Sequence, residues 1–102
     1  MRIYFEVIGR LGTKIRVTED HWNFIVHCKH LEIEGMEREV QETIIAPEIV
    51  RVSQEDNSVC LYYRKFRKYF VCVVCKHLNG DGFIITCYLT DKAKEGQQIW
   101  PK

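Results

Sequence analysis

Two strongly apolar segments in the second half of the chain, joined by a short glycine turn, constrain the fold more than any other feature. Tyr69–His77 and Phe83–Thr90 are each long enough for a strand, and Asn79–Gly82 between them is a typical hairpin turn. Successive side chains of a strand point to opposite faces of a sheet. Phe83, Ile85, Cys87 and Leu89 would therefore share one wholly apolar face, which we predict to lie in the core.

Alternating apolar residues predict four further strands, and two amphipathic stretches predict helices. The expected strands are an N-terminal β-hairpin formed by residues 1–8 and 13–17, and the segments 49–53 and 59–64. The expected helices are residues 18–31, with Thr18 as the N-cap, and residues 36–46, which end before Pro47. This order indicates the α+β class, with both helices on one face of a four-stranded antiparallel meander made by the last four strands.

Length and composition limit the possible cellular settings. A length of 102 residues is typical of one domain, so we interpret residues 1–102 as a single domain. No apolar run approaches the roughly 20 residues that cross a bilayer, and the first residues lack the layout of a signal peptide. The five cysteines are an odd number, and four of them lie in apolar, β-rich segments, which favours free thiols in a reducing compartment. We therefore expect a cytoplasmic protein that does not contact a membrane.

Charge is distributed unevenly although the formal net charge is only +1. Six glutamates lie between residues 32 and 48, whereas residues 62–77 contain five lysines and arginines and no acid. We expect one acidic and one basic side, and a basic strand region of this kind can receive a polyanion. The alternative is an ordinary solvated helix face and a solvated hairpin tip.

Strand alternation gathers polar side chains on the face opposite the predicted core. If the turn is symmetric about Gly80, Lys76 faces Ile84, and Thr86, Tyr88 and Thr90 share its face. A shift of one residue would place Lys76 opposite Phe83 on the core side, and we reject it because an unpaired lysine is costly to bury. The neighbouring hairpin leaves two alternatives open. Either Tyr62 and Arg64, or Tyr63 and Lys65, join this face.

A face with lysine, threonine, tyrosine and a second basic residue is suited to phosphodiester chemistry. Cleavage of RNA by its own 2′-OH requires a base, an acid and positive charge near the phosphorane oxygens. Histidine is the natural acid or base near neutral pH. Of the four histidines, His30 lies where the first helix ends, from which it could reach over the sheet edge. The alternative is the solvent-exposed face of a sheet, where threonine and tyrosine are common.

Metal sites are weakly indicated. Cys72 and Cys75 match the spelling CxxC, but residues three apart in one strand point to opposite faces, so their sulfurs cannot share a metal. His27 and His30, with Glu34, form only a weak constellation of ligands. We therefore predict no metal site.

Several short motifs from Arg16 to Trp100 resemble those of the small phage- and bacteria-associated domains grouped as barnase/EndoU/colicin/RelE-like (BECR) nucleases. The most specific carrier is the block 82–90, Gly-Phe-Ile-Ile-Thr-Cys-Tyr-Leu-Thr. The other carriers are Thr18 with His21-Trp22, Lys29-His30-Leu31-Glu32, Ile45-Ala46-Pro47, Leu61-Tyr62-Tyr63 and Val73-Val74-Cys75-Lys76. Similar sequences usually read His-Pro-Glu at His30 and Thr-Ala-Tyr in the last strand, where this chain has Leu31 and Cys87.

The resemblance implies a BECR-like fold and metal-independent RNA cleavage without a cofactor, often by a toxin that a partner antitoxin protein holds in check. Carried over to this chain, it implies that His30 is the acid or base and that Lys76 stabilises the phosphorane. Thr86 and Tyr88 would position or protonate phosphate oxygens. The RNA-binding residues would be Arg64 or Lys65, with Tyr62 and His21. The alternative function is a non-catalytic RNA- or protein-binding module on the same fold.

Overall fold

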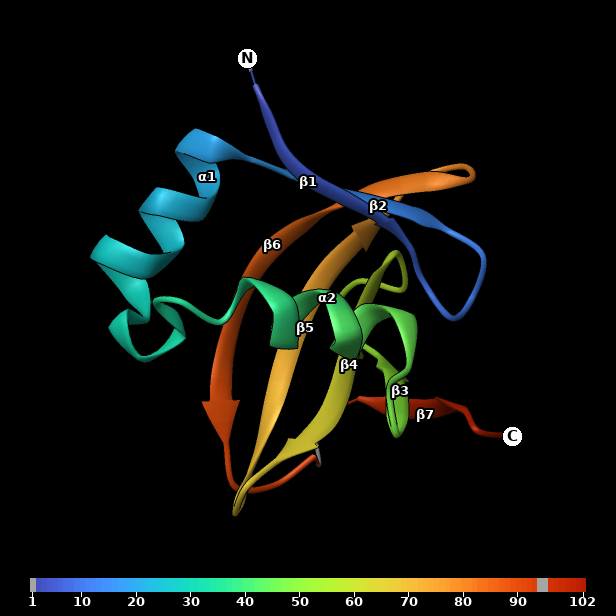
Figure 1. Ribbon diagram of the computed structural model, residues 1–102. Helices are drawn as coiled ribbons and strands as arrows, with labels where there is room; N and C mark the ends of the chain where they lie inside the picture. The colour runs from blue at the N-terminus through green and yellow to red at the C-terminus, as the bar shows by residue number, and fades with distance from the viewer. Residues whose placement is uncertain (1, 94–95) are drawn as a thin grey trace.

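A computed structural model describes residues 2–93 and 96–102 and places all the strands among them in one seven-stranded sheet (Figure 1). The order across the sheet is β1-β2-β6-β5-β4-β3-β7. The strands are β1 (Ile3–Ile8), β2 (Lys14–Thr18), β3 (Ile49–Val52), β4 (Val59–Phe66), β5 (Tyr69–His77), β6 (Asp81–Thr90) and β7 (Gln97–Trp100). The predicted N-terminal hairpin and the α+β class are confirmed.

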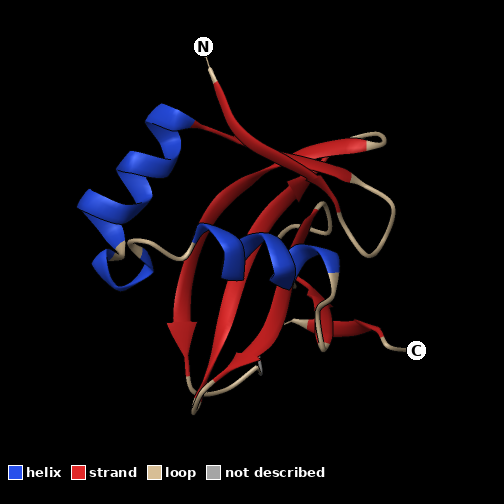
Figure 2. Cartoon of the chain, in the orientation of Figure 1, coloured by secondary structure: helices blue, strands red, loops and turns tan. Residues whose placement is uncertain are grey.

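Two helical segments follow the N-terminal hairpin (Figure 2). α1 (Glu19–Phe24) continues into a π-helical turn, η1 (Ile25–Lys29), and a 3-10 turn, η2 (Leu31–Ile33). α2 (Glu37–Ile45) ends two residues before Pro47. The Thr18 hydroxyl accepts a hydrogen bond from the backbone N–H of His21 at 3.1 Å, which confirms the predicted N-cap. No helix of the described residues is long and apolar enough to span a membrane.

The sheet differs from the predicted four-stranded meander. β3 to β6 do pair in sequence, but β2 joins β6 by parallel pairing, and β7 adds an edge strand beside β3. The parallel pairing sets Ile15 of β2 beside Gly82 of β6, where a Cβ would lie 3.2 Å from the Ile15 side chain and would collide with the carbonyl of Lys76 in β5. Neither that long-range contact nor the strand in the polar C-terminal tail has a local sequence signal, so the meander prediction was wrong.

The register of β5 against β6 also differs at the end next to the turn. Thr86 lies opposite Val74 as predicted, but a β-bulge omits Ile85 from the register and places Lys76 opposite Phe83. The bulge turns Ile84 into the core, whereas Phe83 is 38% exposed. The prediction that Phe83 belongs to the core was therefore wrong. Lys76 still lies on the face of Val74 and Thr86, because residues two apart in β5 share a face, and the bulge brings Phe83 to that face in place of Ile84.

The two faces of the sheet are covered differently. The helices pack on one face, called here the covered face, and bury the main core between them and the strands. That core includes Trp22, Ile25, Ile33, Val40 and Ile44 from the helical segments and Ile15, Tyr62, Val71, Val73, Ile84 and Cys87 from the strands. The opposite face, called the open face, carries a small cluster whose buried members are Leu61, Tyr63 and Cys72.

Candidate functional site

A groove with a volume of about 580 Å³ lies on the open face. Its floor is formed by alternate side chains of the three central strands β4, β5 and β6, and the β3–β4 loop forms part of its wall. The lining residues are Val59, Leu61, Val74, Thr86, Tyr88, Ser53, Gln54, Glu55 and Gly96. Its volume lies within the roughly 300–1,000 Å³ of ligand-binding sites.

Thr86 presents an unusual hydroxyl at this groove. Its Oγ1 atom is buried and has no hydrogen-bond partner among the described residues. A buried hydroxyl without a partner costs on the order of 1–3 kcal/mol, so such groups are rare and often mark functional sites. A ligand oxygen or a water molecule that enters the groove would satisfy it.

His30 reaches the open face over the edge of β6, as predicted from its position at the end of the first helical segment. The His30 ring lies 5.4 Å from the Tyr88 ring, centroid to centroid, with an angle of 38° between the planes. On its other side, Nδ1 of His30 lies 3.4 Å from Oε2 of Glu32. The structure thus joins a histidine, an orienting carboxylate and a tyrosine that lines the groove, which is an arrangement suited to acid–base chemistry.

Lys76 is the next residue of β5 after Val74 on the open face, and its side chain pairs with Asp56. Its Nζ donates a hydrogen bond to Oδ2 of Asp56 at 2.8 Å. This hydrogen bond from Lys76, with further ones from Ser58, holds the pKa of Asp56 well below its usual range. Asp56 therefore stays ionised near neutral pH and pairs with Lys76, which uses one of its three N–H donors in this hydrogen bond.

The predicted RNA-binding residues are divided between the two faces. Of the two pairs that could join the face of Lys76, the structure places Tyr63 and Lys65 there. They lie opposite Cys72 and Phe70 on the open face. Tyr62 lies on the covered face and is 0% exposed, so its ring cannot stack on a base and that prediction is corrected. Arg64 also leaves the open face, because its guanidinium donates to the carbonyl of Ala46 at 2.6 Å.

His21 lies away from the groove. Its Nε2 is 2.7 Å from the carbonyl oxygen of Ile85, and it lines a separate cavity with Arg16 and Phe83. This contact ties α1 to the bulge of β6. A role for His21 in the same RNA site is therefore not supported by its position.

His77 was not among the predicted site residues, and the structure gives it a structural role. Its Nε2 lies 2.8 Å from the hydroxyl of Tyr62, and its Nδ1 lies 3.3 Å from the hydroxyl of Thr13. Burial lowers the pKa of His77 and raises that of Tyr62. Both groups therefore stay neutral. His77, at the end of β5, connects Tyr62 of β4 to Thr13 in the turn of the N-terminal hairpin.

The expected separation of acidic and basic sides is not observed. Glu39 and Glu42 of α2 line one cavity together with Arg64 and Lys65 of β4. The two charged segments are adjacent because α2 packs across the strands that carry the basic residues (Figure 1).

Four of the five cysteines occupy the positions expected of buried thiols. Cys60, Cys72, Cys75 and Cys87 are buried, whereas Cys28 is exposed. Cys72 belongs to the cluster on the open face and Cys75 to the main core, so the CxxC sulfurs do point to opposite faces. Burial raises the pKa of Cys87 to about 12 and that of Cys75 well above its ordinary value. These thiols are poor nucleophiles.

Comparison of the chain with protein-family models, curated proteins and solved structures finds no match in any of the three. The candidate site therefore rests on geometry and on the chemistry of its side chains. Its members are His30, Glu32, Thr86 and Tyr88, with Lys76 at the end of the same face.

Proposed function

We propose that this protein is a metal-independent ribonuclease and that its site lies where His30 meets Tyr88 at the edge of the groove. The observation that carries the proposal is the packing of these two rings, with centroids 5.4 Å apart, beside a buried hydroxyl that has no partner among the described residues. A groove on an open sheet face is accessible to a single RNA strand. The BECR-like assignment and a toxin role in the cytoplasm, controlled by an antitoxin protein, are parts of this proposal that come from the family resemblance.

The chemistry assigns a separate task to each side chain. His30, oriented by Glu32, takes the proton of the 2′-OH as it attacks the adjacent phosphorus. The Tyr88 hydroxyl is the candidate proton donor to the leaving 5′-oxygen, and the Thr86 hydroxyl donates to a non-bridging phosphate oxygen. Lys76 supplies positive charge and donates to phosphate with an N–H that Asp56 does not use. The products would be a 2′,3′-cyclic phosphate and a free 5′-hydroxyl.

The test is cleavage of a fluorogenic single-stranded RNA in EDTA by wild type, His30→Ala and Tyr88→Phe. We expect His30→Ala to lose about 100-fold or more of the rate, since acid–base catalysis contributes on the order of 10²–10⁴-fold. His27→Ala is the matched control, because His27 is an exposed histidine of the same helical segment that lines a different cavity. Equal rates for wild type and His30→Ala would reject the site.

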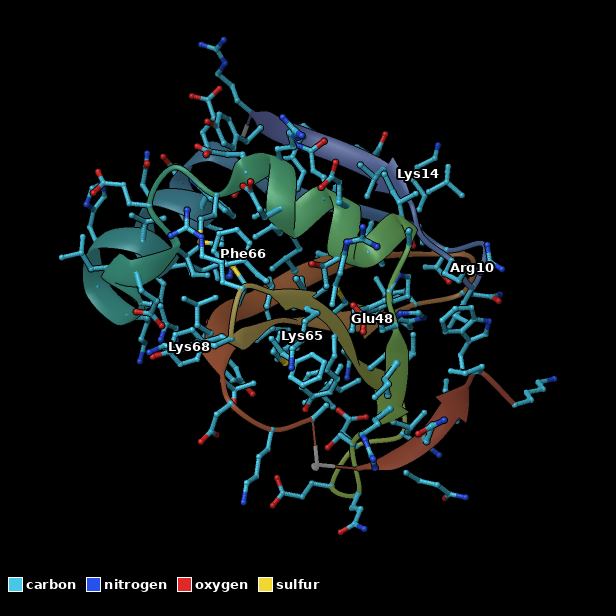
Figure 3. All side chains as sticks on the ribbon, turned by 60° about the horizontal axis from the view of Figure 1, so that its bottom comes forward. Arg10, Lys14, Glu48, Lys65, Phe66 and Lys68 are labelled. Carbon is cyan, nitrogen blue, oxygen red and sulfur yellow. The ribbon has the colours of Figure 1, made fainter. Side chains whose placement is uncertain are left out.

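A non-catalytic RNA-binding module is the second candidate, favoured by the β4–β5 hairpin. Three cations there lie over aromatic rings, with distances to the ring centroid of 4.8 Å for Lys65 on Phe70, 5.2 Å for Arg67 on Phe66 and 5.6 Å for Lys68 on Tyr69. Figure 3 shows Lys65, Phe66 and Lys68 around this hairpin. Exposed cations beside aromatic rings suit phosphate contact and base stacking.

An RNA-binding experiment combined with the cleavage assay distinguishes the two candidates. Both predict that Arg67→Glu combined with Lys68→Glu weakens binding of a labelled RNA oligonucleotide, measured by fluorescence anisotropy at several salt concentrations. Tight, salt-dependent binding by wild type, with intact RNA in every cleavage lane, would favour the binding module. Cleavage that depends on His30 would favour the ribonuclease.

A further inference from the structure

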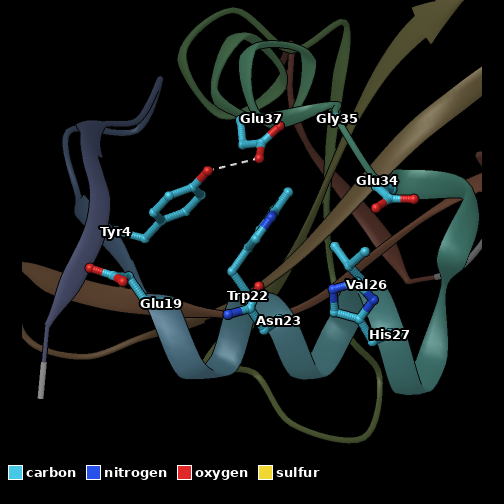
Figure 4. A pocket seen from close by; sticks show the side chains of 9 residues that line it. All are labelled: Tyr4, Glu19, Trp22, Asn23, Val26, His27, Glu34, Gly35 and Glu37. Atoms are coloured by element: carbon cyan, nitrogen blue, oxygen red, sulfur yellow. Dashed lines mark hydrogen bonds between the residues drawn. The ribbon is translucent and has the colours of Figure 1, made fainter.

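A further cavity, lined by different chemistry from the groove, lies between β1, α1 and the start of α2. Its volume is about 160 Å³, and Figure 4 shows the side chains around it. Aromatic rings and carboxylates dominate its lining, which consists of Tyr4, Glu19, Trp22, Asn23, Val26, His27, Glu34, Gly35 and Glu37. The volume is smaller than the roughly 300 Å³ at the lower end of drug-sized sites, so it suits one side chain of a partner.

The aromatic part of this cavity is fixed in place. The Trp22 ring packs on Tyr4 and Phe5, with centroid distances of 6.0 and 5.6 Å. The Tyr4 hydroxyl donates to Oε2 of Glu37 at 2.8 Å, and this hydrogen bond raises the pKa of Tyr4. The faces of tryptophan and tyrosine attract cations, and a neighbouring carboxylate strengthens that preference.

Trp22 also offers a hydrogen-bond donor to the cavity. Its side chain is only 4% exposed and lines the cavity, yet its indole N–H makes no hydrogen bond within the described part of the chain. The N–H itself is not sealed from the cavity, so an acceptor that enters can reach it. A ligand that carries an acceptor oxygen as well as positive charge can therefore use both features.

The negative charge of the cavity is only partly balanced. Glu19 pairs with Arg2 at 3.1 Å on the rim, where the Arg2 side chain is 85% exposed. Glu34 and Glu37 form no ion pair with any lysine or arginine among the described residues. In Figure 4, Glu37 lies above the Trp22 ring beside Tyr4, and Glu34 lies above Val26 and His27. Carboxylates beside aromatic faces suit an organic cation, because its apolar stem can pack on the rings while its charge meets the acids.

We infer that this cavity binds the ammonium or guanidinium group of a lysine or arginine side chain from a partner polypeptide. The cation lies against Trp22 and Tyr4 and pairs with Glu34 and Glu37. A main-chain carbonyl of the same segment accepts the indole N–H of Trp22. The inference does not depend on the proposed ribonuclease activity, because none of these residues lines the groove.

The test uses the fluorescence of Trp22. Trp100→Phe leaves Trp22 as the single tryptophan of the chain. This variant is titrated at constant ionic strength with three probes: Nα-acetyl-lysine methylamide, the arginine equivalent, and the uncharged norleucine equivalent. We expect a saturable change with the lysine or the arginine probe and none with norleucine. The stronger of the two responses identifies the side chain that the site prefers.

Two charge variants in the same background complete the test. Glu34→Gln combined with Glu37→Gln should weaken binding at least tenfold, and the new amide oxygen can still accept the hydrogen bond from Tyr4. Glu42→Gln is the matched control, since it removes one carboxylate from the same helix outside the cavity. Circular dichroism establishes that each variant is folded. A flat titration with both cations, an equal response to norleucine, or unchanged binding in the double variant would overturn the inference.

Discussion

The covered and open faces of one sheet show how differently two surfaces of the same strands can be used. Among the described residues, the covered face buries apolar side chains of both helices and five strands in a continuous core, whereas the open face buries only Leu61, Tyr63 and Cys72. The same β5 strand contributes Val73 and Cys75 to the first and Cys72 to the second. Stability is therefore concentrated on one side, which leaves the other side free to carry polar groups that cost stability.

The distribution of polar groups follows this division. On the covered face, the hydroxyl of Tyr62 has found His77 as a partner. On the open face, the hydroxyl of Thr86 has none among the described residues. A satisfied polar group stabilises a fold, and an unsatisfied one is a feature that ligand binding can use.

The largest expected effect comes from truncating one core residue on each face. Ile84→Ala should lower the free energy of unfolding by about 3–4 kcal/mol, because Ile84 is fully buried under the helices. Leu61→Ala should cost about 2 kcal/mol, since the space it leaves opens into the groove. Urea denaturation measures both. An equal or larger loss at Leu61 would show that the open face contributes as much stability as the covered one.

A pH titration should detect the buried histidine of the covered face. Because burial lowers the pKa of His77 below 6.5, the unfolded state binds more protons than the folded state between the folded-state pKa and about pH 6.5. The free energy of unfolding should be highest above about pH 6.5 and should fall as the pH drops toward the folded-state pKa. His77→Gln removes this titration, so its unfolding free energy should change less between about pH 7.5 and 5.5. Parallel curves for the two proteins would contradict this role.

The orphan hydroxyl of the open face predicts an opposite change in stability and activity. Thr86→Val keeps the shape of the side chain and removes the hydroxyl that has no partner among the described residues. Its free energy of unfolding should rise by about 0.5–1 kcal/mol. RNA cleavage should fall at the same time if the hydroxyl contacts phosphate. Thr90→Val on the same strand is the control, since its hydroxyl already contacts Lys92 and its loss should not stabilise the fold.

The smallest effect concerns thiol exposure. In the native protein only Cys28 should react quickly with a thiol reagent, because the other four cysteines are buried. At urea concentrations below the unfolding midpoint, Cys72 of the open-face cluster should become reactive before Cys75 of the main core. Mass spectrometry after labelling identifies each site. Simultaneous labelling of both would indicate that the two faces open together.

Local sequence signals determined the elements of this fold. Apolar periodicity located both helices and six of the seven strands, and Thr18 marked the helix start that the structure confirms. These signals depend on neighbours within a few residues, so they can be recognised in the chain alone. The shared face of Lys76, Thr86 and Tyr88 and the reach of His30 to the sheet edge followed from the same local geometry.

Only the tertiary structure decided which of the site residues meet. The bulge at Ile85 and the parallel pairing of β2 with β6 depend on contacts between distant parts of the chain, which leave no local pattern. Those contacts turned Phe83 outward and Ile84 inward, and the β4–β5 register placed Tyr62 in the core and Lys65 on the open face. Residue types and spacings therefore fixed the possible chemistry, while long-range packing fixed which side chains share a surface.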